Sequence, residues 1–148
     1  MNKDLLDKLC SQPCSLTFPP AVKADSARAI EQLKEMNFAA PTPDYLAFLS
    51  YCDGFYYDGL ELFGIRTHLR MSKQYTFPNL VEQNRNFCQY TFFIGKLIIG
   101  RISEHFIIYD EHNKLYAIVD RVNLCSMVEF SDFDGLLSTL CQLCSTAG

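Results

Sequence analysis

Cysteines near the two ends of the chain come closest to a metal-binding pattern. Cys10 and Cys14 are separated by three residues, and Cys141 and Cys144 by two. Four thiolates bind zinc tetrahedrally if the two pairs meet in the fold. The competing interpretation is structural, because Cys141 and Cys144 continue an apolar stripe in the predicted last helix, where cysteine acts as a small buried hydrophobe. We predict that all seven cysteines are reduced and that neither a metal nor another cofactor is bound.

Nucleophile and phosphate-binding patterns are incomplete in this sequence. Residues 95–101 resemble a phosphate loop, but they lack the Lys and the Ser/Thr that should follow the second glycine. His105 and His112 have a poor spacing for a local metal site, and neither Gly-x-Ser-x-Gly nor His-Glu-x-x-His is present. We therefore predict that the protein is not an enzyme. A Cys–His pair that meets only in the fold stays open as an alternative.

Charge along the chain favours a basic protein partner. The 148 residues carry 13 basic and 17 acidic side chains, a net charge of −4, whereas a nucleic-acid surface normally needs a basic excess. Residues 104–134 hold seven of the acids against two basic side chains. An acidic face of this kind suits a basic protein better than a phosphate polymer.

One small basic cluster interrupts this pattern. It comprises Arg66, His68, Arg70 and Lys73 in a predicted loop. Such a cluster is able to hold a phosphate or an acidic partner, although a solvated loop is the simpler interpretation.

The segment 53–58 is the strongest candidate for a binding feature. It places Phe55, Tyr56 and Tyr57 between Asp53 and Asp58, and it follows a predicted helix, so it should project as a loop. Aromatic residues, Tyr especially, are enriched at protein-binding hot spots. In the alternative interpretation, two of the three rings cover the core beside the helix.

We predict a partner-binding surface that joins this segment to acids of the following strands. Its members are Asp53, Tyr56, Tyr57, Asp58, Glu104, Asp110 and Glu111. The sequence leaves open whether the segment 53–58 and the predicted turn at 111–114 share one face.

The periodicity of apolar residues predicts one α+β domain over residues 1–148. Helices are expected over residues 25–36, 43–52, 79–87 and 131–144, with Thr42 as a cap and Pro43 at the first helical position. Strands are expected over 60–65, 91–94, 97–102, 105–110, 115–121 and 125–130. Residues 1–23 are expected to be an irregular segment, and 66–78 a loop. The order indicates an antiparallel β-meander packed with N-terminal helices and a C-terminal helix.

The order of short motifs resembles the SUKH superfamily. Residues 41–54, Pro-Thr-Pro-Asp-Tyr-Leu-Ala-Phe-Leu-Ser-Tyr-Cys-Asp-Gly, and residues 59–64, Gly-Leu-Glu-Leu-Phe-Gly, carry most of the resemblance. Later segments in the same order are 80–87, 93–95, 108–110, 116–120 and 131–133. The similarity extends over about residues 24–144 and is greatest to the YrhA-like branch. The resemblance implies an α+β binding fold with no shared catalytic residues, and many bacterial members are immunity proteins that neutralise polymorphic or contact-dependent toxins.

The expected function follows from these observations together. The N-terminus has acids where a signal peptide needs basic residues, and no apolar run approaches the roughly 18 residues that span a bilayer, so we expect a cytoplasmic bacterial protein that binds neither membrane nor nucleic acid. We expect a non-enzymatic protein-binding module, an immunity protein that occludes a basic toxin domain. The alternative is a small-molecule-binding or catalytic domain with a pocket between helices and sheet.

Overall fold

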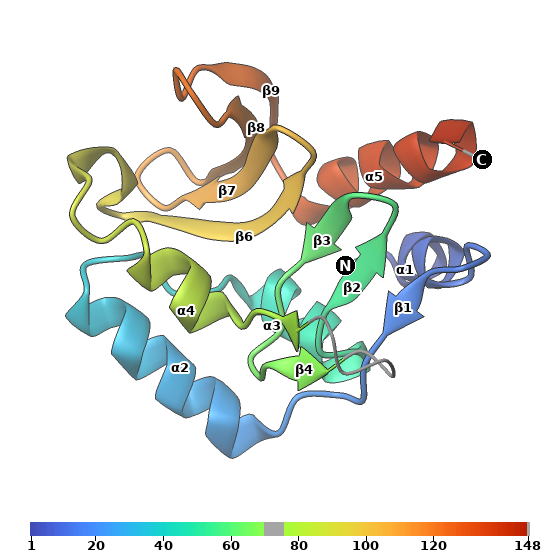
Figure 1. Ribbon diagram of the computed structural model, residues 1–148, viewed down its shortest axis with the longest axis horizontal. Coiled ribbons are helices and arrows are strands. Elements are labelled where there is room, and N and C mark those ends of the chain that lie inside the picture. The colour runs from blue at the N-terminus through green and yellow to red at the C-terminus, as the bar shows by residue number, and fades with distance from the viewer. Residues whose placement is uncertain (70–75, 148) are drawn as a thin grey trace.

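The computed structural model describes residues 1–69 and 76–147, and Figure 1 shows helices packed around an antiparallel sheet. The helices are α1 (Lys3–Cys10), α2 (Lys23–Glu35), α3 (Pro43–Tyr51), α4 (Leu80–Arg85), the 3-10 helix η1 (Thr91–Phe93) and α5 (Phe133–Ala147). The strands are β1 (Leu16–Thr17), β2 (Phe55–Tyr57), β3 (Leu60–Leu62), β4 (His68–Leu69), β5 (Thr76–Phe77), β6 (Lys96–Ile102), β7 (His105–Asp110), β8 (Leu115–Asp120) and β9 (Ser126–Phe130). The predicted α+β fold is confirmed.

The main sheet extends the predicted meander on one side. Among the described residues it has seven strands in the order β1-β2-β3-β6-β7-β8-β9, and every pairing is antiparallel. Strands β6 to β9 form the meander. The β2–β3 hairpin, residues 55–62, joins it through the pairing of β3 with β6, so the hairpin belongs to the same sheet as the later strands.

Both faces of the sheet carry apolar side chains, because strand residues alternate between the faces. On one face α5 packs on the sheet, and the Phe133 ring lies 5.6 Å from the Tyr116 ring. On the other face the segment after α4 covers the sheet, and the Phe87 ring lies 5.1 Å from the Phe106 ring. The core is therefore divided by the sheet, with helices on each side.

Helix α3 begins as the sequence predicts. The Thr42 hydroxyl accepts the N–H of Tyr45 at 3.1 Å, and Pro43 occupies the first helical position, where its missing N–H costs nothing. Tyr45, Phe48 and Leu49 are fully buried. Tyr45 and Phe48 of this helix contact Phe133 of α5.

The expectation of an irregular segment over residues 1–23 was wrong. Asn2 caps α1 by accepting the N–H of Asp4, and Leu6 and Leu9 are fully buried against α5. The helix is too short to be stable alone, so its formation depends on this tertiary packing. Further along, β1 pairs with β2 at the edge of the sheet.

Three other elements differ from the predictions. Residues 91–93 form η1 rather than a strand, because Phe93 turns inward to contact the Phe87 ring at 5.4 Å. The predicted loop over 66–78 contains β4 and β5. Helix α2 covers Lys23–Glu35 rather than residues 25–36, so Asp25 lies in its first turn.

Candidate functional site

Residues 53–58 lead into a β-hairpin rather than forming a projecting loop. Strand β2 pairs with β3, and Asp58 and Gly59 form the turn between them, with φ of +42° and +86°. Two positive φ angles are typical of tight hairpin turns whose twist matches that of the strands. Neighbouring strand residues point to opposite faces, and Tyr56 and Tyr57 nevertheless both line a groove beside the Asp58 turn.

Asp53 is fully buried and is a structural residue. Its Oδ1 accepts the N–H of Ile65 at 2.6 Å, and its Oδ2 accepts the N–H of Arg66 at 3.0 Å. His68 Nε2 lies 2.8 Å from the same Oδ2, and the Phe18 ring stacks on His68 with 4.2 Å between centroids. The buried carboxylate is bound by these donors, so the structure does not place Asp53 at the surface, where the sequence predicted a partner contact.

Gly64 packs against the Asp53-Gly54 pair through a close backbone contact. A Cβ at Gly64 would lie 2.2 Å from the carbonyl oxygen of Asp53, which no side chain permits. Gly54, with φ of +109°, also faces Gly64, since its Cβ would lie 3.2 Å from the Gly64 nitrogen. These glycines allow two backbone segments to touch, and they serve the fold.

Asp110 is the second predicted contact residue that the structure buries. Its Oδ1 accepts the N–H of His112 at 3.0 Å, and its Oδ2 accepts the side-chain amide of Asn113 at 2.8 Å. Burial acts to raise the pKa of Asp110, but the hydrogen bonds from Asn113 and His112 outweigh it and hold that pKa below its usual value. Asp110 therefore shapes the turn at 111–114, and little of its side chain is left exposed for the partner contact that the sequence predicted.

The three aromatic side chains of β2 divide between core and surface. Phe55 is buried, and the half-buried Tyr56 packs on Phe77 with 5.4 Å between centroids. Tyr57 is also half-buried and lies on the opposite face from Tyr56. Of the predicted aromatic contacts, Tyr57 is the better placed to meet a partner.

The sheet brings two of the predicted acids together and separates the third. Ser103 donates its N–H to the Gly59 carbonyl at 3.2 Å, so the turn with the exposed Asp58 lies beside the turn with the exposed Glu104. Glu111 is exposed as well, but it follows β7, whose six residues extend over roughly 20 Å. Glu104 precedes that strand. The acids therefore occupy opposite ends of the sheet.

Two adjoining grooves lie beside the Asp58 turn. One, of about 340 Å³, lies between the β2–β3 hairpin, the end of β6 and α5, and the other, of about 580 Å³, is bordered by the connection from α1 to β1. Both are lined by Tyr57, Asp58 and Cys144. Leu143, which lines the first groove, is 42% exposed. We call Tyr57, Asp58, Glu104 and Leu143 the hairpin surface.

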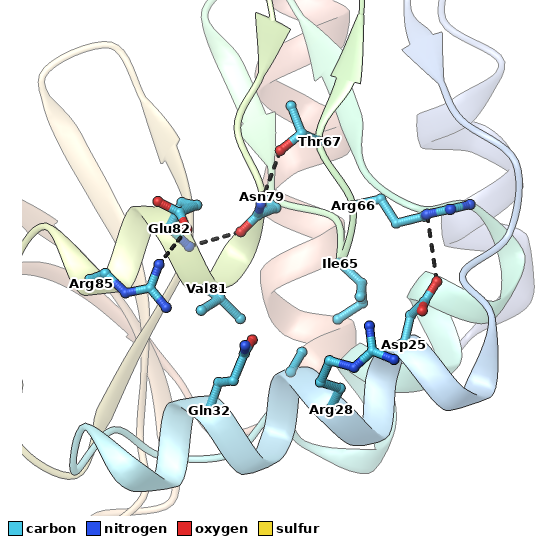
Figure 2. Close-up of a pocket in the computed structure, with 11 residues that line it drawn as sticks. Asp25, Arg28, Gln32, Ile65, Arg66, Thr67, Asn79, Val81, Glu82 and Arg85 are labelled. Carbon is cyan, nitrogen blue, oxygen red and sulfur yellow. Dashed lines mark hydrogen bonds and ion pairs between the residues drawn. The ribbon is translucent and has the colours of Figure 1, made fainter.

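A further groove, of about 500 Å³, lies between α2 and α4 (Figure 2). We call it the arginine groove, because Arg28 of α2, Arg66 of the segment after β3 and Arg85 of α4 all line it. Of the basic cluster predicted from the sequence, Arg66 lines this groove, whereas His68 faces Asp53. Arg70 and Lys73 lie outside the described residues. The sequence did not identify Arg28 and Arg85 as groove residues. Helical periodicity places Arg28 on the water-facing side of its helix and does not show that it lies near Arg85.

Cys141 and Cys144 act as small buried side chains of the last helix, as one of the two interpretations of their spacing predicted. Cys141 and Cys144 are buried on α5, and across residues 1–69 and 76–147 no group of three or more His, Cys, Asp or Glu side chains is placed to hold a metal. A hydrogen bond with Cys52 lowers the pKa of the Cys10 thiol, which is half-buried. Burial raises the pKa of Cys144 to about 11. All seven thiols are free.

The sequence comparisons identified no relative of this chain. Neither a protein-family model nor a curated protein matches this chain. Within the described residues, no helix is both long enough and apolar enough to traverse a bilayer.

Proposed function

We propose that the chain is a non-enzymatic protein-binding module of SUKH type, an immunity protein that neutralises a bacterial toxin domain by occluding it. The observation that carries the proposal is the hairpin surface, where Tyr57 and Leu143 lie beside Asp58 at the end of the sheet. The sequence resemblance to SUKH proteins supplies the class of partner. The proposal places the protein in the bacterial cytoplasm, where its thiols remain reduced.

The composition of the hairpin surface suits a basic partner. Protein interfaces combine a buried aromatic or aliphatic centre with a polar rim. Tyr57 and Leu143 supply such a centre here, and Asp58 and the neighbouring Glu104 supply negative charge at its rim. In a chain of net charge −4, these acids add to the overall field that attracts a basic protein.

Different residues of this surface control the association rate and the dissociation rate of the partner. The exposed acids act over a distance, so they speed the encounter with a basic partner and are sensitive to salt. Tyr57 acts only after contact, when its ring is buried and its hydroxyl finds a partner, so it slows dissociation.

The alternative, a small-molecule-binding or catalytic domain, needs a pocket between helices and sheet. The arginine groove lies between two helices, and the described residues that line it include neither histidine nor cysteine. Its polar side chains are mostly engaged with one another, Asn79 with Thr67, Arg66 with Asp25 and Arg85 with Glu82, which supports a binding role better than a catalytic one.

Charge-reversal variants at the two ends of the sheet test the proposal. The partner to use is a candidate toxin domain, taken from an open reading frame that neighbours this gene and produced with the full chain in a heterologous bacterial host. Asp58→Lys and Glu104→Lys should each slow association and flatten its salt dependence, whereas the matched variant Glu111→Lys, at the opposite end of β7, should have a much smaller effect on association. Tyr57→Ala should raise the dissociation rate, at a cost of about 2 kcal/mol or more.

The measurements are association and dissociation rates by surface-based interferometry and survival of the host in the presence of the toxin domain. Equal effects of Glu104→Lys and Glu111→Lys would assign the attraction to net charge and contradict the hairpin surface. Failure of the wild-type chain to bind the toxin domain or protect the host would contradict the immunity function.

A further inference from the structure

The arginine groove is a second surface, remote from the hairpin surface. Helices α2 and α4, which form its walls, lie on the other side of the molecule from the C-terminal part of α5 (Figure 1). Its lining residues contribute three arginines, Arg28, Arg66 and Arg85, against two carboxylates, Asp25 and Glu82. The groove therefore carries one net positive charge on a chain whose net charge is −4.

The ion pairs within the groove are exposed and easily exchanged. Arg66 Nε lies 3.5 Å from Asp25 Oδ2, and the Arg66 side chain is 65% exposed. Arg85 donates to Glu82, and both side chains are exposed. Exposed pairs of this kind contribute little to stability, so each guanidinium can turn to an incoming carboxylate at small cost.

Arg28 is the arginine with no such partner. Within the described part of the chain no carboxylate forms an ion pair with it, and Figure 2 shows its side chain reaching from α2 into the groove. Its planar guanidinium offers a fork of donors that matches both oxygens of a carboxylate.

The floor of the groove is apolar. Ala29, Ile65 and Val81 line it, and each is more than nine-tenths buried against the core, so the floor presents a small apolar contact to a ligand. A carboxylate that binds Arg28 would therefore lie next to a patch that accepts a hydrocarbon group. This combination favours a ligand that carries both, rather than an inorganic anion.

The walls of the groove are held rigidly. The Asn79 side chain donates to the Thr67 hydroxyl at 2.9 Å and accepts the N–H of Glu82 at 2.8 Å, which ties the segment after β3 to the start of α4 (Figure 2). Asn84 is buried and accepts the N–H of Ile98 at 2.8 Å, which fixes α4 to the sheet. The backbone of Arg66 is anchored by Asp53. Binding would therefore cost little backbone ordering.

We infer that the arginine groove binds an acidic segment of a partner protein, in which carboxylates alternate with apolar side chains. Two observations favour a protein segment. The guanidiniums are exposed along an open groove, whereas small molecules favour pockets that enclose most of their surface. Asp25 and Glu82 stand among the arginines and leave one net positive charge, which suits a few carboxylates on a protein segment better than a continuous run of phosphates.

A designed peptide tests this inference without knowledge of the natural partner. The probe is an acetylated, amidated octapeptide of alternating Glu and Leu, and its control has Gln at every Glu position. Both are titrated into the isotope-labelled full chain and followed by nuclear magnetic resonance. The Glu peptide should shift the signals of Arg28, Arg66 and Arg85, and the Gln peptide should not.

Variants on one helix separate the groove from general attraction. Arg28→Gln should weaken binding of the Glu peptide about fivefold, as expected for loss of one exposed charged contact. Lys34→Gln removes the same charge from an exposed position on α2 outside the groove, and it should leave affinity unchanged. Arg28→Lys should recover only part of the affinity, because lysine lacks the planar fork.

Three results would overturn the inference. They are signal shifts confined to residues outside the groove or absent altogether, equal weakening by Lys34→Gln and Arg28→Gln, and tighter binding of free glutarate or inorganic phosphate than of the Glu peptide. The last result would assign the groove to a small anion. None of them bears on the hairpin surface, so the proposed function is tested separately.

Discussion

At the scale of single residues, the partners of a carboxylate decide its role. Asp53 and Asp58 flank the same three aromatic residues, yet one is fully buried and the other is exposed at a hairpin turn. The donors that bind Asp53 come from Ile65, Arg66 and His68, which no local pattern connects to it. The sequence could identify the acidic and aromatic composition of the segment, but not which acid finds buried donors.

Asp53→Ala should therefore act on stability. The variant leaves the buried N–H of Ile65 and the half-buried N–H of Arg66 without an acceptor, and we expect the free energy of unfolding to fall by about 3–5 kcal/mol. Asp58→Ala, at the exposed turn, should change it by less than about 0.5 kcal/mol. Chemical denaturation followed by circular dichroism measures both. A fully stable Asp53→Ala variant would show that the buried carboxylate does not hold the segment after β3.

Tyr116 predicts how stability depends on alkaline pH. Burial raises its pKa to about 12, with a further contribution from the negative charge of Asp44, while its hydrogen bond with Thr42 acts in the opposite direction. The folded pKa exceeds the unfolded value of about 10. The stabilisation is therefore complete below about pH 10 and is lost as the pH rises towards about 12.

Comparison with Tyr116→Phe isolates this contribution. Phenylalanine keeps the ring and removes the ionisable hydroxyl, so the variant should lose less stability than the wild type between about pH 9 and about pH 12. The measurement is denaturant unfolding across this range. Parallel pH profiles for the two proteins would show that the Tyr116 hydroxyl does not titrate differently in the folded and unfolded states.

At the scale of elements, predictions succeed where local signals and burial agree. Thr42 and Pro43 mark the start of α3 through a cap and a preset backbone angle, both of which are local effects. The signals around residues 91–94 point to a strand, but the buried contact between Phe93 and Phe87 selects a 3-10 turn. Helix α1 was not predicted for a related reason, because its apolar side is buried only by packing against α5.

Phe48→Ala tests whether α3 is a core element. The Phe48 ring is fully buried, with centroid distances of 5.4 Å to Tyr45 and 6.3 Å to Phe133. Its truncation should lower the free energy of unfolding by about 3–5 kcal/mol. Ser50→Ala, on the exposed side of the same helix, should have almost no effect. An unchanged melting temperature with lost partner binding would instead identify Phe48 as a contact residue.

At the scale of the whole molecule, topology decides which predicted residues become neighbours. The β3–β6 pairing places the turns of Asp58 and Glu104 side by side, while the length of β7 separates Glu104 from Glu111. Neither relation can be read from periodicity, which fixes the face of a residue but not the order of strands. The arginine groove depends in the same way on the packing of α2 against α4.

Thiol reactivity provides a test of the whole fold. Cys14, Cys88 and Cys125 are exposed and should react rapidly with iodoacetamide in the folded protein, whereas Cys52, Cys141 and Cys144 are buried and should react only on unfolding. Mass spectrometry of the labelled peptides measures this pattern. Labelling of Cys141 as fast as Cys88 would show that α1 does not stay on α5, because the Cys141 thiol lies against the Leu5 carbonyl at 3.3 Å.

The contact between α1 and α5 also has a consequence for how the protein is made. The backbone N–H of Asn2 donates to Asp134, 132 residues later, and the buried leucines of α1 face the same helix. At translation rates of about 5–20 residues per second, the ribosome needs on the order of ten seconds to add this stretch. Throughout that time the first helix has no surface on which to dock and is too short to persist alone. Leu6 and Leu9 are therefore open to chaperones on the nascent chain until α5 has been synthesised.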